Sequence, residues 1–200
     1  MQIIIVRHGR TAFNAEGRYQ GSLDTDLDET GRAQAAGLHA VLPSGIEVLV
    51  SSPMRRARQT AEAVAAARAL PLALAADFRE RAAGVLEGLT LAEVQAHHAE
   101  LWERRVLRQW DEAPPGGESI RDVFHRVGRG LEALRSAHAG RCVALVAHGF
   151  VSKAIRATVL GRTDDFFSWQ LGNCEHVGFE IGPGALPEPE RLGQGWRVPR

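Results

Sequence analysis

The sequence Ile3-Ile4-Ile5-Val6-Arg7-His8-Gly9 is an apolar run that ends abruptly in a histidine and a glycine. A second run, Ala144-Leu145-Val146-Ala147, ends in the same way at His148-Gly149. Both runs are too short for a helix and have the composition of buried parallel strands. Because open α/β sheets bind ligands at the carboxyl ends of their strands, the two endings predict that His8 and His148 share one site.

Strand-like and helix-like patterns alternate along the rest of the chain. Apolar runs predict strands at 47–50, 72–74, 142–147 and 176–181. Capping residues with helical spacing predict helices at about 30–42, from Pro53, over 90–110 with a possible break, from the cap at Ser119, and at about 150–160. The helical stretch over 90–110 begins with a capping box from Thr90 to Glu93, and the last helix ends at Gly161. This alternation predicts an α/β fold with a mostly parallel central sheet that helices cover on both faces.

The 200 residues suit one domain. We expect a catalytic domain over 1–182, in which the helical stretch at about 90–115 is an insertion over the carboxyl edge of the sheet. The tail at 183–200 is spaced by prolines and predicts a linker-like segment, in which Trp196 is the residue placed to dock. Trp102 and Trp110, within the insertion, are expected to anchor a core, and an insertion over the site leaves room for a role as ligand platforms instead.

Charge and composition exclude several classes of protein. The formal net charge is zero, which argues against binding nucleic acid or a membrane surface through overall charge. No apolar run approaches the roughly 20 residues of a membrane span, and no basic leader precedes the first strand. Cys142 and Cys174 are expected to be buried free thiols in apolar strand-like segments, so we expect a cytoplasmic protein.

Several cationic groups are predicted to meet at the sheet edge. Ser52 is placed to cap the helix that begins at Pro53, which puts Arg56 in its first turn beside Arg7, His8 and His148. Guanidinium groups bind phosphate or carboxylate oxygens in pairs, and the amino ends of two helices would add partial positive charge. A phosphoryl group fits such a pocket best.

The histidines call for a role beyond binding an anion. A neutral imidazole can attack phosphorus and carry the phosphoryl group covalently, and the nearby arginines favour the neutral form of His8. Glu80 is the candidate general acid, since its irregular segment, Phe78-Arg79-Glu80-Arg81, could reach the same edge. The plainer alternatives are structural histidines and surface ion pairs, with Glu80 paired to Arg79 or Arg81.

Five ordered motifs carry a family resemblance. They are Arg7-His8-Gly9-Arg10-Thr11 with Asn14 and Gln20-Gly21, the segment from Ser51 to Ala61, Glu80 with Gly84 and Glu87-Gly88, Gly116-Gly117-Glu118-Ser119, and Ala147-His148-Gly149. Over roughly residues 1–181 the chain resembles the histidine phosphatase superfamily, the phosphoglycerate-mutase-like proteins of branch 1.

The resemblance implies a mechanism and a set of site residues. His8 would be the phosphorylated nucleophile, Arg7, Arg56 and His148 would hold the phosphoryl oxygens, and Glu80 would act as general acid and then as base. The substrate contacts would come from Asn14, Thr11, Gln20, Gly21 and Gly149. The family resemblance implies no metal and no organic cofactor.

Departures from the family pattern bear on the substrate. Arg10, Phe13 and Phe150 differ from the commonest residues at their positions, and Ala82 and Ala83 stand where true mutases tend to carry larger polar or aromatic residues. We therefore expect a phosphatase of small phosphomonoesters, more like the cofactor-independent broad-specificity or α-ribazole phosphatases than the mutases.

Three alternatives stay open. A phosphoglycerate mutase would return the phosphoryl group to a second hydroxyl, and an inactive module would bind phosphate without turnover. A metal hydrolase using both histidines and Glu80 ranks lowest, because the arginines would repel a divalent cation. The expected partner is a small-molecule phosphoester, and a homodimer is one option.

Overall fold

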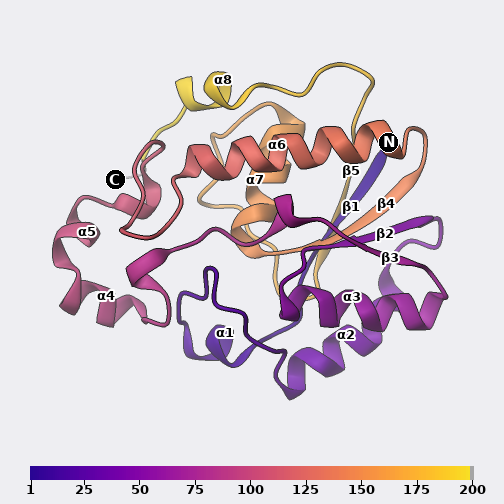
Figure 1. The fold of residues 1–200 in the computed structure, drawn as a ribbon, viewed down its shortest axis with the longest axis horizontal. Helices are drawn as coiled ribbons and strands as arrows, with labels where there is room; N and C mark the ends of the chain where they lie inside the picture. The colour runs from indigo at the N-terminus through magenta and orange to yellow at the C-terminus, as the bar shows by residue number, and fades with distance from the viewer. Residues whose placement is uncertain (199–200) are drawn as a thin grey trace.

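The computed structural model describes residues 1–198, and the centre of this part is a five-stranded sheet in the order β3-β2-β4-β1-β5 (Figure 1). The first four strands run parallel to their neighbours, and β5 pairs antiparallel with β1. The predicted mostly parallel sheet is therefore confirmed. The strands are β1 (Gln2–Arg7), β2 (Val48–Ser51), β3 (Leu72–Leu74), β4 (Cys142–Ala147) and β5 (His176–Glu180).

Strands β1 and β4 are buried on both faces, as their continuous apolar sequences predict. Ile3 and Ile5 point into one hydrophobic cluster, whereas Ile4 and Val6 point into the cluster on the opposite face. Strand β4 alternates in the same way. Side chains of a strand alternate between faces, so a fully apolar strand requires a helical layer on each side.

Helices supply these two layers (Figure 1). On one face lie α2 (Glu29–Val41) and α3 (Arg55–Arg68), and on the other lie α6 (Ile120–Ala137) and α7 (Gly149–Leu160). Ser119 caps α6 through a capping box, and Gly161 ends α7 in the left-handed conformation, both as predicted.

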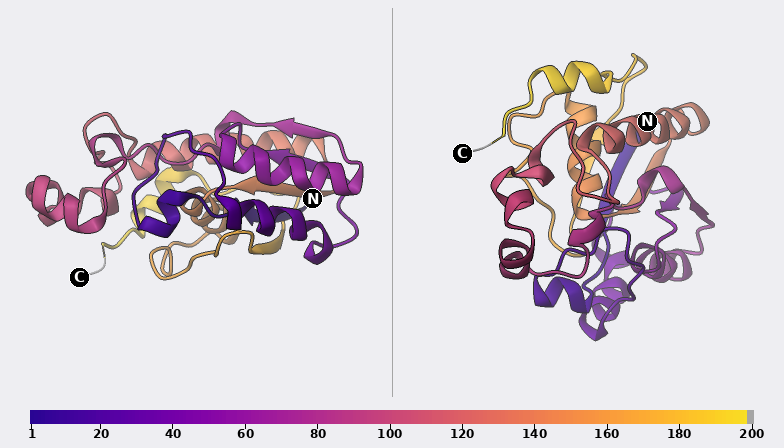
Figure 2. Two further views of the ribbon diagram at one scale, coloured as in Figure 1. Left: turned by 90° about the horizontal axis from the view of Figure 1, so that it is seen from below. Right: turned by 60° about the vertical axis from the view of Figure 1, so that its left-hand side comes forward.

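The insertion is helical but broken into short pieces. It contains α4 (Leu91–His97), α5 (Ala99–Glu103) and a 3₁₀ turn at Val106–Arg108, and the predicted capping box from Thr90 to Glu93 is present. Leu86, Val94 and Val106 are buried in a small hydrophobic cluster that is separate from the two clusters on the sheet. Figure 2 shows the insertion at the end of the molecule opposite residue 1, past the sheet.

The start of α3 differs from the prediction. The helix begins at Arg55 rather than Pro53, and Met54 occupies the N-cap position without a side-chain hydrogen bond. Ser52 is therefore not the N-cap residue, although its hydroxyl oxygen accepts the amide N–H of Met54 and also contacts Nε2 of His148. Arg56 is still in the first turn. The short helix α1 (Ala12–Glu16) was not predicted, since five residues give too little periodicity to detect.

The prediction of a linker-like tail is wrong for residues 189–196. Helix α8 (Pro189–Gln194) packs on α6, and Leu192 is buried. The Trp196 ring lies 5.0 Å from the Trp110 ring and 4.9 Å from the Phe166 ring, between ring centroids. The docking of Trp196 is confirmed, and the tail thereby covers one edge of the helical layer.

The two cysteines are free but differ in their surroundings. Cys142 is buried in β4 as expected, whereas Cys174 is half-buried in the turn before β5, with a φ of 57°. The strand-like context predicted for Cys174 is therefore wrong. Across residues 1–198, no helix combines the length and apolar character needed to cross a membrane.

Candidate active site

A pocket of about 480 Å³ opens at the carboxyl ends of β1 and β4. The register of these strands pairs Arg7 with Ala147. The residues that follow the two strands, His8 and His148, therefore lie side by side. Their ring centroids are 5.2 Å apart. The predicted meeting of the two histidines is thus present in the structure, and it follows directly from the level ends of the two strands.

His8 is held in one tautomer. Its Nδ1 atom lies 2.7 Å from the carbonyl oxygen of Gly9, which can only accept, so Nδ1 donates and Nε2 of the neutral ring keeps its lone pair. Burial lowers the pKa of His8 well below its usual value of 6.5, and the positive charge of Arg56 and then of Arg7 adds to this shift. The ring is therefore neutral at pH 7.

His148 is oriented through Ser52. Its Nε2 atom lies 2.8 Å from the Ser52 hydroxyl oxygen, which also accepts the amide N–H of Met54. The hydroxyl group can donate its proton to Nε2 or accept one from it, and the first arrangement leaves the ring proton on Nδ1. Nδ1 is buried and has no hydrogen-bond partner among the described residues. Burial, followed by the charge of Arg56, lowers the pKa of His148 well below 6.5.

Two arginines flank the histidines without a carboxylate partner. Nη1 of Arg7 donates to the carbonyl oxygen of Leu171, and the two Nη atoms of Arg56 donate to the carbonyl oxygens of Leu23 and Gly21. In both side chains the Nε–H is buried, and within residues 1–198 nothing accepts it. Buried donors of this kind are rare unless a ligand completes them. Both arginines present such donors at the predicted site.

Glu80 reaches the same pocket. Its carboxylate accepts the amide N–H groups of Phe150 and Val151, at 3.2 and 3.3 Å, and that of Arg81 at 2.9 Å. These contacts place Glu80 on the amino end of α7. The prediction that this end helps to bind an anionic ligand is therefore wrong, because Glu80 already occupies it. The amino end of α3 is also occupied, since the amide of Arg55 donates to Asp24. The positive charge of the pocket therefore comes from side chains.

Cations outnumber carboxylates around the pocket. Besides Arg7 and Arg56, its lining includes Arg81, Arg108 and Lys153, whereas Glu80 is the only carboxylate among the described lining residues. Burial lowers the pKa of Arg81 to about 10, and burial and then the charge of Arg7 lower the pKa of Lys153. At a pKa of about 10, Arg81 remains a cation at pH 7. The charge balance favours an anionic ligand.

The predicted substrate contacts divide into two groups. Asn14, Gln20, Gly21 and Gly149 line the pocket. Thr11 does not, because it is fully buried and its hydroxyl group bonds with the side chains of Asn14 and Gln20. Thr11 thus shapes the pocket from behind, as the N-cap of α1.

The sequence did not identify several residues of this site. Asn173 donates from Nδ2 to the carbonyl oxygen of His8, at 3.0 Å, and the segment that precedes it contributes Phe166, Phe167 and Gln170 to the lining. This segment has no periodicity to assign. Lys153 carried a usable signal, since it is the single lysine of the chain and lies one helical turn beyond Gly149.

The metal-hydrolase alternative requires a cluster of ligands. In the part of the chain that the structure describes, no group of three or more histidine, cysteine, aspartate or glutamate side chains is arranged to hold a metal ion.

Comparisons with known proteins agree with this geometry. The chain is 38% identical over 207 residues to glucosyl-3-phosphoglycerate phosphatase of Mycolicibacterium vanbaalenii, covering 94% of this chain and 90% of that protein. It is 33% identical over 187 residues to phosphoserine phosphatase 1 of Hydrogenobacter thermophilus, covering 90% and 85%. The chain spans only 41% of the length of a bifunctional protein of Mycobacterium tuberculosis that it matches at 38% identity over 149 residues.

Solved structures and a family model give the same assignment. A mycobacterial glucosyl-3-phosphoglycerate phosphatase in complex with VO3 superposes with a TM-score of 0.80 and 32% identity, covering 88% of this chain and 91% of that one. The model of the histidine phosphatase superfamily (branch 1) matches residues 3–191. On these grounds, the chain belongs to branch 1 of the histidine phosphatase superfamily.

Proposed function

We propose that the protein hydrolyses small phosphomonoesters through a covalent phosphohistidine on His8. The observation that carries this proposal is the hydrogen bond between Nδ1 of His8 and the carbonyl oxygen of Gly9. It leaves Nε2 as the unprotonated ring nitrogen, in a pocket where Arg7 and Arg56 present unpartnered N–H donors. A neutral nucleophile beside fixed cations is the arrangement that phosphoryl transfer to nitrogen requires.

In the first step, the Nε2 lone pair forms a bond to phosphorus while the bond from phosphorus to the ester oxygen breaks. Glu80, entering as the carboxylic acid, gives its proton to that oxygen, and the alcohol leaves. Arg7, Arg56 and the Nδ1–H of His148 donate to the phosphoryl oxygens, whose negative charge they stabilise.

In the second step, a water molecule attacks phosphorus on the opposite side from Nε2. The Glu80 carboxylate takes a proton from this water, the bond between phosphorus and Nε2 breaks, and inorganic phosphate is released. His8 recovers its neutral form and Glu80 its proton. No step calls for a metal ion, so we expect full activity in excess chelator.

The names of two relatives support hydrolysis over transfer to a second hydroxyl. Two of the relatives described above are named as phosphatases, one of glucosyl-3-phosphoglycerate and one of phosphoserine. The small side chains of Ala82 and Ala83, next to Glu80, agree with this preference. The free cysteines agree with a reducing compartment, and we propose a cytoplasmic location.

The proposal is tested with a panel of phosphomonoesters, including both phosphoglycerates, assayed with and without chelator. Brief incubation with a labelled ester is expected to give protein label that is stable in alkali and labile in acid. The label and the activity should both vanish in His8→Asn and persist in His97→Asn, whose side chain lies exposed on α4. Full turnover by His8→Asn would contradict the mechanism, and label passing to a second hydroxyl instead of water would indicate a mutase.

A further inference from the structure

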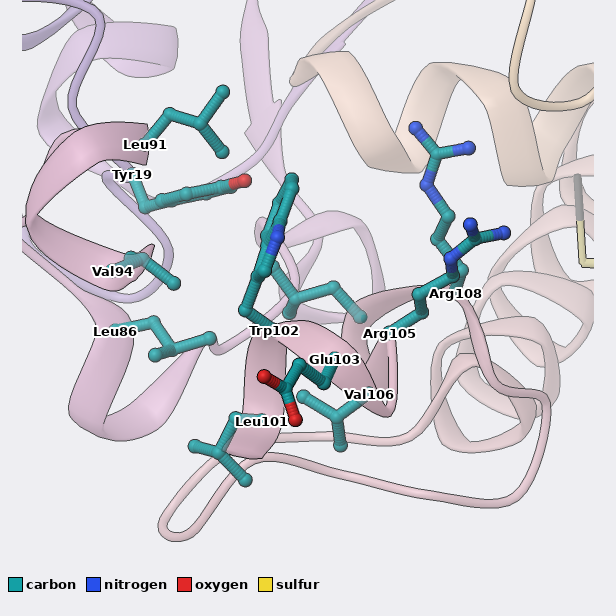
Figure 3. Close-up of a pocket in the computed structure, with 11 residues that line it drawn as sticks. Tyr19, Leu86, Leu91, Val94, Leu101, Trp102, Glu103, Arg105, Val106 and Arg108 are labelled. Atoms are coloured by element: carbon teal, nitrogen blue, oxygen red, sulfur yellow. The ribbon is translucent and has the colours of Figure 1, made fainter. Parts of the chain in front are cut away.

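A second pocket, also of about 480 Å³, lies inside the insertion, and we call it the insertion chamber. Its walls are mostly apolar and include Leu86, Val94 and Val106, which are buried. Figure 3 shows Tyr19 reaching toward Trp102 across this space, with Leu86, Leu91 and Val94 beside it. The volume lies in the range of pockets that bind small molecules.

The mouth of the chamber carries apolar side chains that the fold leaves exposed. Trp102 is 41% exposed and Leu91 is 46% exposed. The prediction that Trp102 anchors a core is therefore wrong. Exposed apolar residues scattered singly need no explanation, but a tryptophan and a leucine at the rim of one concave apolar space indicate a binding surface.

The insertion chamber adjoins the catalytic pocket and shares part of its wall with it. Tyr19, Leu107 and Arg108 line both spaces. A ligand whose phosphoryl group lies against His8 can therefore extend past Tyr19 into the chamber. This shared wall favours part of the substrate as the occupant over a separate ligand or a protein partner.

The junction between the two spaces is fixed by contacts on both sides. The backbone N–H of Tyr19 donates to the carbonyl oxygen of Leu89, and the amide of Gly88 donates to the carbonyl oxygen of Tyr19, just before the insertion. Arg108 stacks over the Phe167 ring at 5.1 Å, and its carbonyl oxygen accepts the indole N–H of Trp196. A rigid junction lets the two spaces bind the two ends of one molecule with little loss of conformational entropy.

We infer that the insertion chamber binds an apolar, ring-containing part of the substrate's leaving group. This inference rests on the proposed phosphatase function and names the class of ester that the site prefers. The flat faces of Trp102 and Tyr19 suit a ring, and the buried aliphatic side chains behind them offer it nothing to hydrogen-bond. Substrates with a small or polar alcohol would leave the chamber filled with water.

The test compares two esters that differ only in the group that would enter the chamber. Ethyl phosphate and 2-(2-naphthyl)ethyl phosphate are both esters of primary alcohols, so their leaving groups have similar acidity. Binding is measured by calorimetry on His8→Ala, which cannot turn over. The naphthyl ester is expected to bind about 30-fold more tightly, from the burial of its rings.

A second variant assigns this advantage to the chamber. Adding Trp102→Ala should reduce the naphthyl advantage about tenfold, and Trp102→Phe should keep most of it. Leu160→Ala is the matched control, because Leu160 is also 41% exposed but lies at the far end of α7. That control should leave the advantage unchanged.

The outcomes separate this inference from the proposed function. Tighter binding of the naphthyl ester that depends on Trp102 supports the chamber, even if the wild-type protein hydrolyses neither ester and the phosphatase proposal fails. A naphthyl ester that binds no more tightly than ethyl phosphate, undetectable binding included, overturns the chamber. Hydrolysis of both esters at equal kcat/KM by the wild type would overturn it too, with the phosphatase intact.

Discussion

The hydroxyl oxygen of Ser52 lies 2.8 Å from Nε2 of His148, and both residues are fully buried. Ser52 follows β2 and His148 follows β4, which are neighbours in the sheet, so the contact joins the ends of two parallel strands. It fixes the ring of a histidine that the proposed mechanism uses only through its other nitrogen. Ser52 is therefore a positioning residue.

Removing the Ser52 hydroxyl group should disturb His148 more than the fold. In Ser52→Ala, Nε2 of His148 loses its donor, and we expect kcat to fall about tenfold, the equivalent of about 1.4 kcal/mol, with a loss of stability of about 1 to 3 kcal/mol. Ser51→Ala is the matched control, since Ser51 is equally buried and donates to the carbonyl oxygen of Ser52. It should lose stability while keeping kcat. Equal kcat in both variants would contradict the positioning role.

The two buried histidines should make stability depend on pH. Their folded-state pKa values are lowered, so between those values and 6.5 the unfolded chain binds more protons than the folded one. The free energy of unfolding should fall as pH drops below about 6.5, by up to about 1.4 kcal/mol per pH unit for each histidine. Denaturant melts from pH 7.5 to 5 would show this slope. It should be shallower in His8→Asn.

We expect Lys153 to lower the stability of the fold and to strengthen substrate binding. It is half-buried in the pocket, and no ion pair involving it is found among the described residues. Lys153→Met removes a desolvated charge, so we expect stability to rise by about 1 kcal/mol. KM for a phosphomonoester should rise about tenfold, because a cation no longer attracts the dianion. Lys153→Arg should keep the lower KM. A fall in stability together with an unchanged KM would show that Lys153 serves the fold only.

Two glycines of α6 offer a matched pair. A methyl group at Gly130 would lie 2.7 Å from Cζ of Phe78, whereas nothing lies within 4 Å of one at Gly128. Gly130→Ala should cost about 1 to 3 kcal/mol of stability through overpacking, and it should lower kcat by moving the segment that leads from Phe78 to Glu80. Gly128→Ala should add about 0.5 to 1 kcal/mol. Thermal melts and kcat values measured on both variants check the prediction.

Trp196 should matter to the site as well as to stability. Its ring packs on Trp110 and Phe166, and its indole N–H donates to the carbonyl oxygen of Arg108, which lines the pocket. We expect Trp196→Ala to lose about 2 to 4 kcal/mol of stability. Trp196→Phe, which keeps the ring contacts but not the donor, should lose less stability and yet raise KM. If both variants keep the wild-type KM, the tail stabilises the fold without shaping the site.

The sequence predicts those parts of the fold that depend on local pattern. The apolar runs ending at His8 and His148, the capping box at Thr90, the cap at Ser119 and the helix end at Gly161 are all found where the sequence places them. In each case neighbouring residues determine the structure. The level ends of β1 and β4 then bring the two histidines together without further information.

The remaining features depend on distant contacts that no local pattern records. Ser52 has the sequence of a helix cap, yet the helix begins at Arg55, and the Ser52 hydroxyl group also contacts a histidine 96 residues away. The amino end of α7 looks free in sequence, yet Glu80 occupies it. Trp196 sits in a proline-spaced tail whose helix forms because Leu192 and the tryptophan find an apolar surface on the helical layer.

The hydrogen bonds around His8 join positions that are made at very different times. Arg7 is held by the carbonyl oxygen of Leu171, and the carbonyl oxygen of His8 is held by Asn173, 164 and 165 positions further along the chain. Synthesis proceeds from the amino end, so the proposed nucleophile leaves the ribosome before Leu171 and Asn173 do. A growing chain thus carries His8 before the hydrogen bonds from Arg7 to Leu171 and from Asn173 to His8 can form. The proposed site is complete only after residue 173 has been added.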